Sequence, residues 1–127
     1  MIHGIWIHGK PVPKGRPRFA RNGGVYTPKT TADYEKRIAD AWREKYGDKQ
    51  VEPRNLAIHV DVYTKRYSTS DVDNFLKIAM DGLQGVAIEN DSCIKVAKVD
   101  KIQVDPPGTD EGMRIALFEF GDNIING

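Results

Sequence analysis

Two adjoining stretches decide the fold of this chain: LAIHVDVY at residues 56–63 and DVDNFLKIAMDGL at residues 71–83. In the first, apolar residues alternate strictly with a second set that includes His59 and Asp61, which predicts a strand with one buried face. In the second, apolar residues recur every three or four positions, which predicts a helix from about Asp73 to Gln84 that ends at Gly85. Its inward side chains are expected to be Phe75, Leu76, Ala79, Met80 and Leu83.

The segments on either side extend this pattern to a complete domain. A strand is predicted over residues 2–8, and a helix after a cap at Thr30 or Thr31, with Gly47 as its end. Two more strands are predicted over residues 94–104 and 113–120, joined by the turn DPPGTDEG, with a bend near residues 98–100. The order β-α-β-α-β-β predicts one α+β domain over residues 1–127, with a mixed sheet packed against two helices.

Composition restricts the class of protein. The 127 residues are 39% hydrophobic and 29% charged, as in ordinary globular domains, and no apolar run reaches the length of a membrane helix. There is a single cysteine, Cys93, and no leader for export, so we expect a cytoplasmic protein. Cys93 and the three histidines have no zinc-binding spacing, and Cys93 is expected to be a small buried residue.

Charge is distributed unevenly along the chain. Residues 1–32 carry six basic residues and no acid, whereas the rest has 13 basic and 18 acidic residues. Phe19 and Tyr26 are interleaved with the basic residues, a mixture that can bind phosphates and stack on exposed bases. We expect residues 10–29 to form a DNA-contacting loop, mobile without DNA; the alternative is an ordinary solvated loop. The expected DNA contacts are Lys10, Lys14, Arg16, Arg18, Arg21 and Lys29.

The carboxylates of Asp71 and Asp73 are candidate metal ligands. At the end of a strand, residues i and i+2 share a face, and two close carboxylates favour a hard cation such as Mg²⁺ or Mn²⁺ between them. Lys77 lies one helical turn after Asp73, where an ammonium could neutralise the charge that develops in phosphodiester cleavage. The alternatives are a helix cap for one aspartate and a surface pair of Lys77 with Asp73 or Asp81.

Asp91 is the third candidate carboxylate. It stands in the sequence Glu89-Asn90-Asp91, after the end of the second helix and before a strand. If that strand lies beside the one that ends near Ser70, Asp91 can approach Asp71 and Asp73, and we expect all three to converge on one ion. The alternative is a simple Asn-Asp turn.

Together these motifs resemble the RusA family of Holliday junction resolvases. The resemblance rests on DVDNFLKIAMDGL with the END turn, and on KPVPKGRPRF and VYTPKTTADYE, which look like the N-terminal region of prophage-encoded members. It spans roughly residues 5 to 120. It implies that Asp71, Asp73 and Asp91 correspond to the essential metal-binding acids and Lys77 to the essential lysine. Some members have Asp-Asp where this chain has Asn90-Asp91, so the role of that first acid does not carry over.

The resemblance implies a homodimeric, Mg²⁺-dependent endonuclease that cuts branched DNA in recombination and repair, with Mn²⁺ able to substitute. Asn74 and Asn90 are secondary candidates beside the acids. Two alternatives stay open: a catalytically silent module that binds DNA junctions, and a metal phosphohydrolase acting on small phosphate esters.

Overall fold

The computed structural model describes residues 2–16, 18–51, 55–104 and 110–119. Four strands form the main sheet in the order β1-β6-β4-β5: β1 (Ile2–His8), β6 (Gly112–Glu119), β4 (Leu56–Thr64) and β5 (Ile94–Gln103). β4 and β5 run parallel, and the other neighbours are antiparallel. The helices are α1 (Lys29–Tyr46) and α2 (Val72–Leu83). The predicted order and the α+β class are therefore confirmed.

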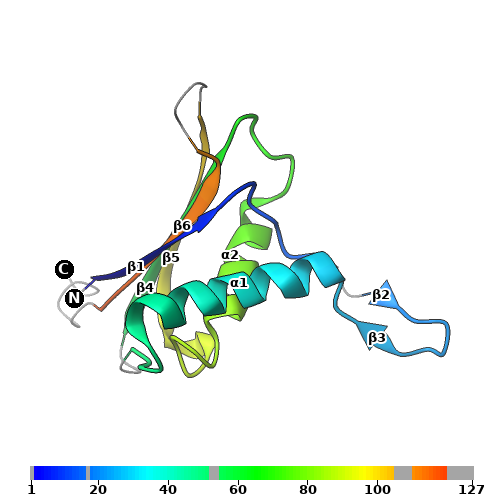
Figure 1. Cartoon of the computed structure of the whole chain (residues 1–127), viewed down its shortest axis with the longest axis horizontal. Helices are drawn as coiled ribbons and strands as arrows, with labels where there is room; N and C mark the ends of the chain where they lie inside the picture. Colours follow the sequence, from blue (N-terminus) through cyan, green and yellow to red (C-terminus); the bar gives the residue numbers. More distant parts are fainter. Residues whose placement is uncertain (1, 17, 52–54, 105–109, 120–127) are drawn as a thin grey trace.

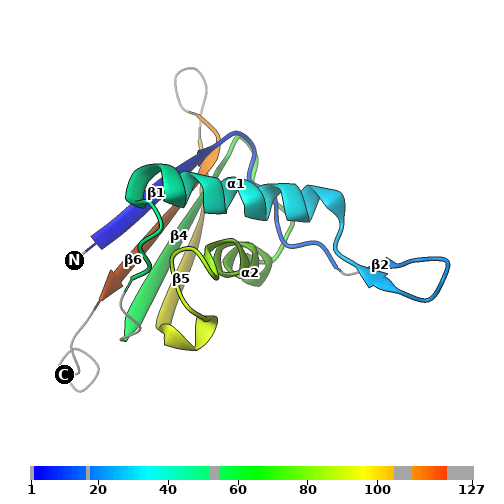
Figure 2. The ribbon, with the colours of Figure 1, turned by 60° about the horizontal axis from the view of Figure 1, so that its bottom comes forward.

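Both helices cover the same face of the sheet (Figures 1 and 2). The alternation of β4 sends Ile58, Val60 and Val62 into the core, while His59 and Asp61 are half-buried on the helix-free face. From α1, Tyr34, Ile38 and Trp42 are buried. The fully buried apolar side chains of strands and helices thus form one core between the two layers.

The two helices approach each other closely where Gly82 of α2 faces Ile38 of α1. A Cβ added at Gly82 would lie 2.8 Å from the Cβ of Ile38. Gly82 therefore allows a contact that no other residue would, although glycine is otherwise unfavourable in a helix. The inner face of α2 is Phe75, Ile78, Ala79, Gly82 and Leu83, and the expected Leu76 and Met80 are only partly buried.

The observed ends of the two helices agree in part with the ends predicted from the sequence. Gly47 follows α1 with a φ of 71°, and Gly85 follows α2 with a φ of 88°, both in the left-handed region that favours glycine. The predicted threonine cap of α1 is wrong. The helix begins at Lys29 after Pro28 without a side-chain cap. Thr31 lies inside the first turn, where its buried hydroxyl accepts a hydrogen bond of 2.9 Å from the Gly15 N–H.

The predicted bend near residues 98–100 is also wrong, because β5 keeps a regular register there. The only shift between β4 and β5 lies at Leu56/Ala57, where the partners step from Ile94 to Val96. The predicted ends of the last strands and their connecting turn fall partly outside the described residues. Two short elements were not predicted: a hairpin of β2 (Arg18–Phe19) and β3 (Val25–Tyr26), and the 3-10 helix η1 (Asp91–Cys93).

Candidate active site and nucleic-acid interface

Asp71 and Asp73 lie at the start of α2, not at a strand end as expected. β4 ends at Thr64, and residues 65–70 intervene before Asp71, which is the N-cap of α2. The Nζ of Lys101 on β5 donates hydrogen bonds to the carbonyls of Ser68 and Ser70, at 3.1 and 3.0 Å. This ammonium ties the segment before Asp71 to the sheet and holds the first turn of α2 beside the carboxyl ends of β4 and β5.

The carboxylates of Asp71 and Asp73 at this helix start make no hydrogen bond or ion pair within the described residues. Asp71 is exposed and makes no side-chain cap hydrogen bond, and Asp73 is exposed in the first turn. Lys77, one turn further on, is exposed and has no ion-pair partner within the described residues. Asp81, its other possible partner, pairs with Lys14 at 3.0 Å. Neither the cap nor the surface ion pair therefore accounts for Asp71, Asp73 and Lys77.

Asp91 lies at the opposite end of α2 from Asp71 and Asp73. It opens η1, which leads directly into β5, and β5 starts beside the start of β4, where Ile94 pairs with Leu56. Figure 1 shows this yellow segment beyond the far end of α2. Lys101, which contacts the Ser70 carbonyl, is seven residues further along β5 than Ile94, or about 23 Å at about 3.3 Å per residue.

The expected convergence of the three aspartates within one chain is therefore not found. Asp71, Asp73 and Asp91 are all described, and they do not form a group with ligand atoms within 4.8 Å of one another. The reason is strand direction: β4 and β5 are neighbours as required, but they are parallel. A parallel neighbour brings Asp91 to the start of β4 and leaves Asp71 beyond its end.

The secondary candidates have local roles. The backbone carbonyl of Asn74 accepts a hydrogen bond of 3.0 Å from the Lys14 N–H. This bond joins the basic segment, residues 10–29, to the first turn of α2. The Asn90 side-chain oxygen accepts from the Ser92 N–H at 2.6 Å and caps η1. The side chain of Asn90 thus orders the turn that carries Asp91.

The basic segment divides into structural and free cations. Lys14 is mostly buried between the helices and pairs with Glu35 at 2.7 Å and with Asp81 at 3.0 Å. Burial lowers the pKa of the Lys14 ammonium, but hydrogen bonds and attraction from Glu35 and Asp81 outweigh it, so the pKa is raised. Lys29 pairs with Asp33 on the surface of α1. Within the described part of residues 10–29, the exposed cations without an acidic partner are Lys10, Arg16, Arg18 and Arg21.

A second cluster of ligand-type side chains lies on the helix-free face of the sheet. The Nε2 of His59 is 3.1 Å from Asp61 and 3.0 Å from Asp100, and the three together could hold a cation. The hydrogen bond from His59 lowers the pKa of Asp100, with Lys98 assisting at 3.6 Å. The alternation of β4 predicts that His59 and Asp61 lie on its less buried face, but it cannot predict the cluster, because only the β4–β5 register brings Asp100 beside Asp61.

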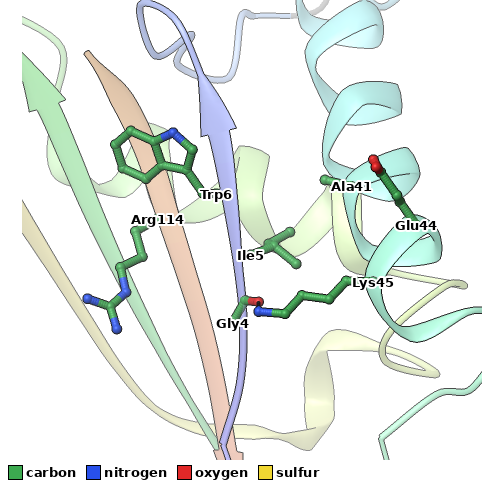
Figure 3. A pocket seen from close by; sticks show the side chains of 7 residues that line it. All are labelled: Gly4, Ile5, Trp6, Ala41, Glu44, Lys45 and Arg114. Carbon is green, nitrogen blue, oxygen red and sulfur yellow. Dashed lines mark hydrogen bonds between the residues drawn. The ribbon is translucent and has the colours of Figure 1, made fainter. Parts of the chain in front are cut away.

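A surface cavity of about 600 Å³ lies at the free edge of β1, and none of the predicted site residues lines it. Figure 3 shows Trp6 and Arg114 on one side of β1 and Lys45 on the other. The Lys45 ammonium donates to the Gly4 carbonyl at 2.6 Å, and the Tyr46 hydroxyl accepts from the Gly4 N–H at 2.7 Å. These contacts satisfy the backbone N–H and carbonyl of Gly4 on this edge strand.

Residues 8–110, most of the chain, match the family described as "Endodeoxyribonuclease RusA". No curated protein matches the sequence. No helix in the described part of the chain is long and apolar enough to cross a membrane.

Proposed function

Because this chain belongs to the RusA family of endodeoxyribonucleases, we propose that it resolves Holliday junctions by paired phosphodiester hydrolysis, with Mg²⁺ or, in its place, Mn²⁺. Its role would be in DNA recombination and repair in the cytoplasm, on branched DNA as substrate. One observation carries the proposal: Asp71 and Asp73 are exposed, the Asp71 side chain makes no cap hydrogen bond, and Lys77, one turn after Asp73, has no ion-pair partner in the described chain.

These residues suit a hard cation. Carboxylate oxygens are the preferred ligands of Mg²⁺ and Mn²⁺, and the Cα–Cβ bond of Asp73 tilts toward the helix start where Asp71 stands. When bound, a cation would supply an activated water and would offset negative charge at the scissile phosphate. Asp71 and Asp73 would hold it, while Lys77 would stabilise the charge that develops on the phosphate oxygens. The free arginines of the basic segment would bind neighbouring phosphates.

The distance of Asp91 from the other two acids is the reason that we infer a homodimer. α2 has 12 residues, about 18 Å at about 1.5 Å per residue, and it separates Asp91 from the other two acids. An ion with oxygen ligands at about 2.0–2.6 Å cannot bridge that distance. We therefore infer that Asp91 of a second copy completes the ligand set, so that the two sites of a symmetric dimer each draw on both chains.

Mixed dimers test this arrangement directly. Asp73→Asn and Asp91→Asn chains with different affinity tags are co-expressed, and the heterodimer is purified over both tags. If each site draws on both chains, the heterodimer has one doubly mutated site and one intact site. It should nick four-way junctions, whereas both mutant homodimers should be inactive.

The opposite outcomes are equally clear. A heterodimer as inactive as the two homodimers would mean that each site lies within one chain. An Asp91→Asn homodimer with native activity would remove Asp91 from the ligand set. Because His59, Asp61 and Asp100 could also hold a cation, Asp100→Asn is the matched control. The Asp100→Asn protein should retain Mg²⁺-dependent cleavage. If it loses cleavage, the catalytic metal site would instead be the His59, Asp61 and Asp100 cluster on the helix-free face.

Substrate choice separates the two alternative functions. Cleavage in Mg²⁺ is compared on a four-way junction, a linear duplex of the same arms and a small phosphodiester. The proposal expects cleavage of the junction only. Junction binding without cleavage would support a silent module, and turnover of the small ester would support a phosphohydrolase.

A further inference from the structure

The β2–β3 hairpin projects from the start of α1, away from the sheet (Figures 1 and 2). It carries three of the most exposed apolar side chains of the described residues: Phe19 is 80% exposed, Val25 61% and Tyr26 50%. Burying such side chains is favourable, so their exposure on one projection indicates a surface that contacts a partner.

The hairpin has two different faces. Phe19 is paired with Val25, and Arg18 with Tyr26. Because directly paired residues share a face and successive residues alternate, one face presents Phe19 and Val25, and the other presents Arg18 and Tyr26. The Phe19 ring and the Arg18 guanidinium thus lie on opposite faces of the hairpin, with Arg16 two residues before Arg18 and Arg21 two residues after Phe19.

Local hydrogen bonds close the turn of the hairpin. The Ala20 N–H donates to the Gly24 carbonyl at 2.6 Å, the Gly23 N–H donates back to the Ala20 carbonyl at 3.0 Å, and Asn22 accepts from the Gly24 N–H at 3.0 Å. Gly23 has a φ of 85°, which a side chain would disfavour. The aromatic ring is therefore presented by a defined turn.

The base of the hairpin is connected to the candidate active site. Gly15 is hydrogen-bonded to the buried Thr31 of α1, with no room for a side chain because an added Cβ would lie 2.7 Å from the Thr31 hydroxyl. The Lys14 N–H donates to the carbonyl of Asn74, the residue after Asp73. The residues that precede the hairpin are therefore held beside the helix start that carries the acids.

We propose that Phe19 is a base-stacking contact that receives an unstacked nucleobase at a DNA branch point, while Arg16, Arg18 and Arg21 hold the phosphates on either side. The inference rests on the proposed function and assigns the hairpin to substrate selection. The local charge favours a nucleic acid over an apolar protein partner, since residues 1–32 contain six cations and no acid. Bases are accessible at a branch point and stacked within a linear duplex, so Phe19 would distinguish the two.

Binding in EDTA tests this without catalysis. Wild type, Phe19→Ala, Phe19→Leu and Phe19→Trp are titrated against a four-way junction and a linear duplex of the same arms. Phe19→Ala should weaken junction binding on the order of tenfold and duplex binding less than twofold. Phe19→Leu keeps apolar area without a π-face and should resemble Phe19→Ala, whereas Phe19→Trp should resemble wild type. Since Phe19 is exposed, all variants should fold, which circular dichroism can verify.

A fluorescent base locates the contact. With 2-aminopurine at the branch point, wild type should change the fluorescence, whereas Phe19→Ala should not; neither should change it when the probe is in an arm. Equal loss of junction and duplex binding, or wild-type junction binding by Phe19→Ala, would overturn the proposal. So would a change in oligomeric state of DNA-free Phe19→Ala by sedimentation, because Phe19 would then be a protein contact.

The two proposals fail separately. If wild type binds junctions through Phe19 but does not cut them in Mg²⁺, the endonuclease proposal fails and the stacking contact stands. If wild type cuts junctions and Phe19→Ala cuts and binds them equally well, only the stacking contact fails.

Discussion

The carboxylate of Asp73 is exposed in the first turn of α2 and has no ion-pair partner in the described part of the chain. Asp73→Asn should lower junction cleavage in Mg²⁺ by more than about 100-fold, or about 2.7 kcal/mol of transition-state stabilisation. Junction affinity in EDTA should be equal or higher, because one anion near the DNA phosphates is removed. The free energy of unfolding should change by less than about 1 kcal/mol. Gel shift, cleavage and urea unfolding measure the three quantities.

Asp48→Asn is the matched control, since it neutralises an exposed aspartate in the turn after α1. It should leave cleavage unchanged. An Asp73→Asn enzyme that retains more than about one hundredth of native activity would rule out Asp73 as a metal ligand.

Lys77 has a charge opposite to that of Asp73, so we predict that its loss affects DNA binding and metal binding differently. Lys77→Met keeps most of the apolar stem of the side chain and removes the ammonium, which has no ion-pair partner in the described chain. Cleavage should be lost, junction binding in EDTA should weaken slightly, and Mg²⁺ affinity by calorimetry should change little. A large loss of Mg²⁺ affinity would instead assign Lys77 to organising the metal site.

At the level of elements, the α1–α2 contact depends on the missing side chain at Gly82. Gly82→Ala places a methyl group 2.8 Å from the Ile38 Cβ, so the helices must separate. We predict a net destabilisation of about 1–2 kcal/mol, because overpacking outweighs the higher helix propensity of alanine. The double variant with Ile38→Val should show a favourable coupling energy in urea unfolding. A stabilised Gly82→Ala protein would contradict the close contact.

In the basic segment, replacing free cations should weaken DNA binding, whereas replacing the ion-paired Lys14 should lower stability. Arg16→Ala with Arg18→Ala should weaken binding to all DNA and reduce the salt-dependence slope by about one to two units. Lys14→Met should leave that slope nearly unchanged, because its charge is already paired with Glu35 and Asp81. It should lower stability by about 1–3 kcal/mol, since two partly buried carboxylates lose their cation. A salt titration and urea unfolding of both proteins separate the two roles.

At the level of the whole molecule, a site shared between copies makes activity depend on assembly. Specific cleavage activity should fall on dilution below the dimer dissociation constant and should recover on concentration, in parallel with the mass measured by light scattering. Constant specific activity in a protein measured as monomeric would contradict a site that draws on two chains.

The sequence by itself determined the two helices, the four strands of the main sheet and most of the core. The alternation of residues 56–63 and the helical periodicity of residues 71–83 specify β4 and α2, because each element buries one face and repeats with its own period. The same stretches identify Asp71, Asp73 and Lys77, which lie together because they are local in the chain. The basic segment is evident from composition, because residues 1–32 contain six cations and no acid.

Only the tertiary structure decided which distant residues meet. That β5 runs parallel to β4 places Asp91 at the far end of α2 and brings Asp100 beside Asp61 and His59. Packing between the helices takes Lys14 and Asp81 out of the set of free charges. Sequence periodicity reports which face of an element is buried, but strand direction and helix contacts depend on interactions between residues far apart in the chain. Those interactions are therefore decided only when the whole chain packs.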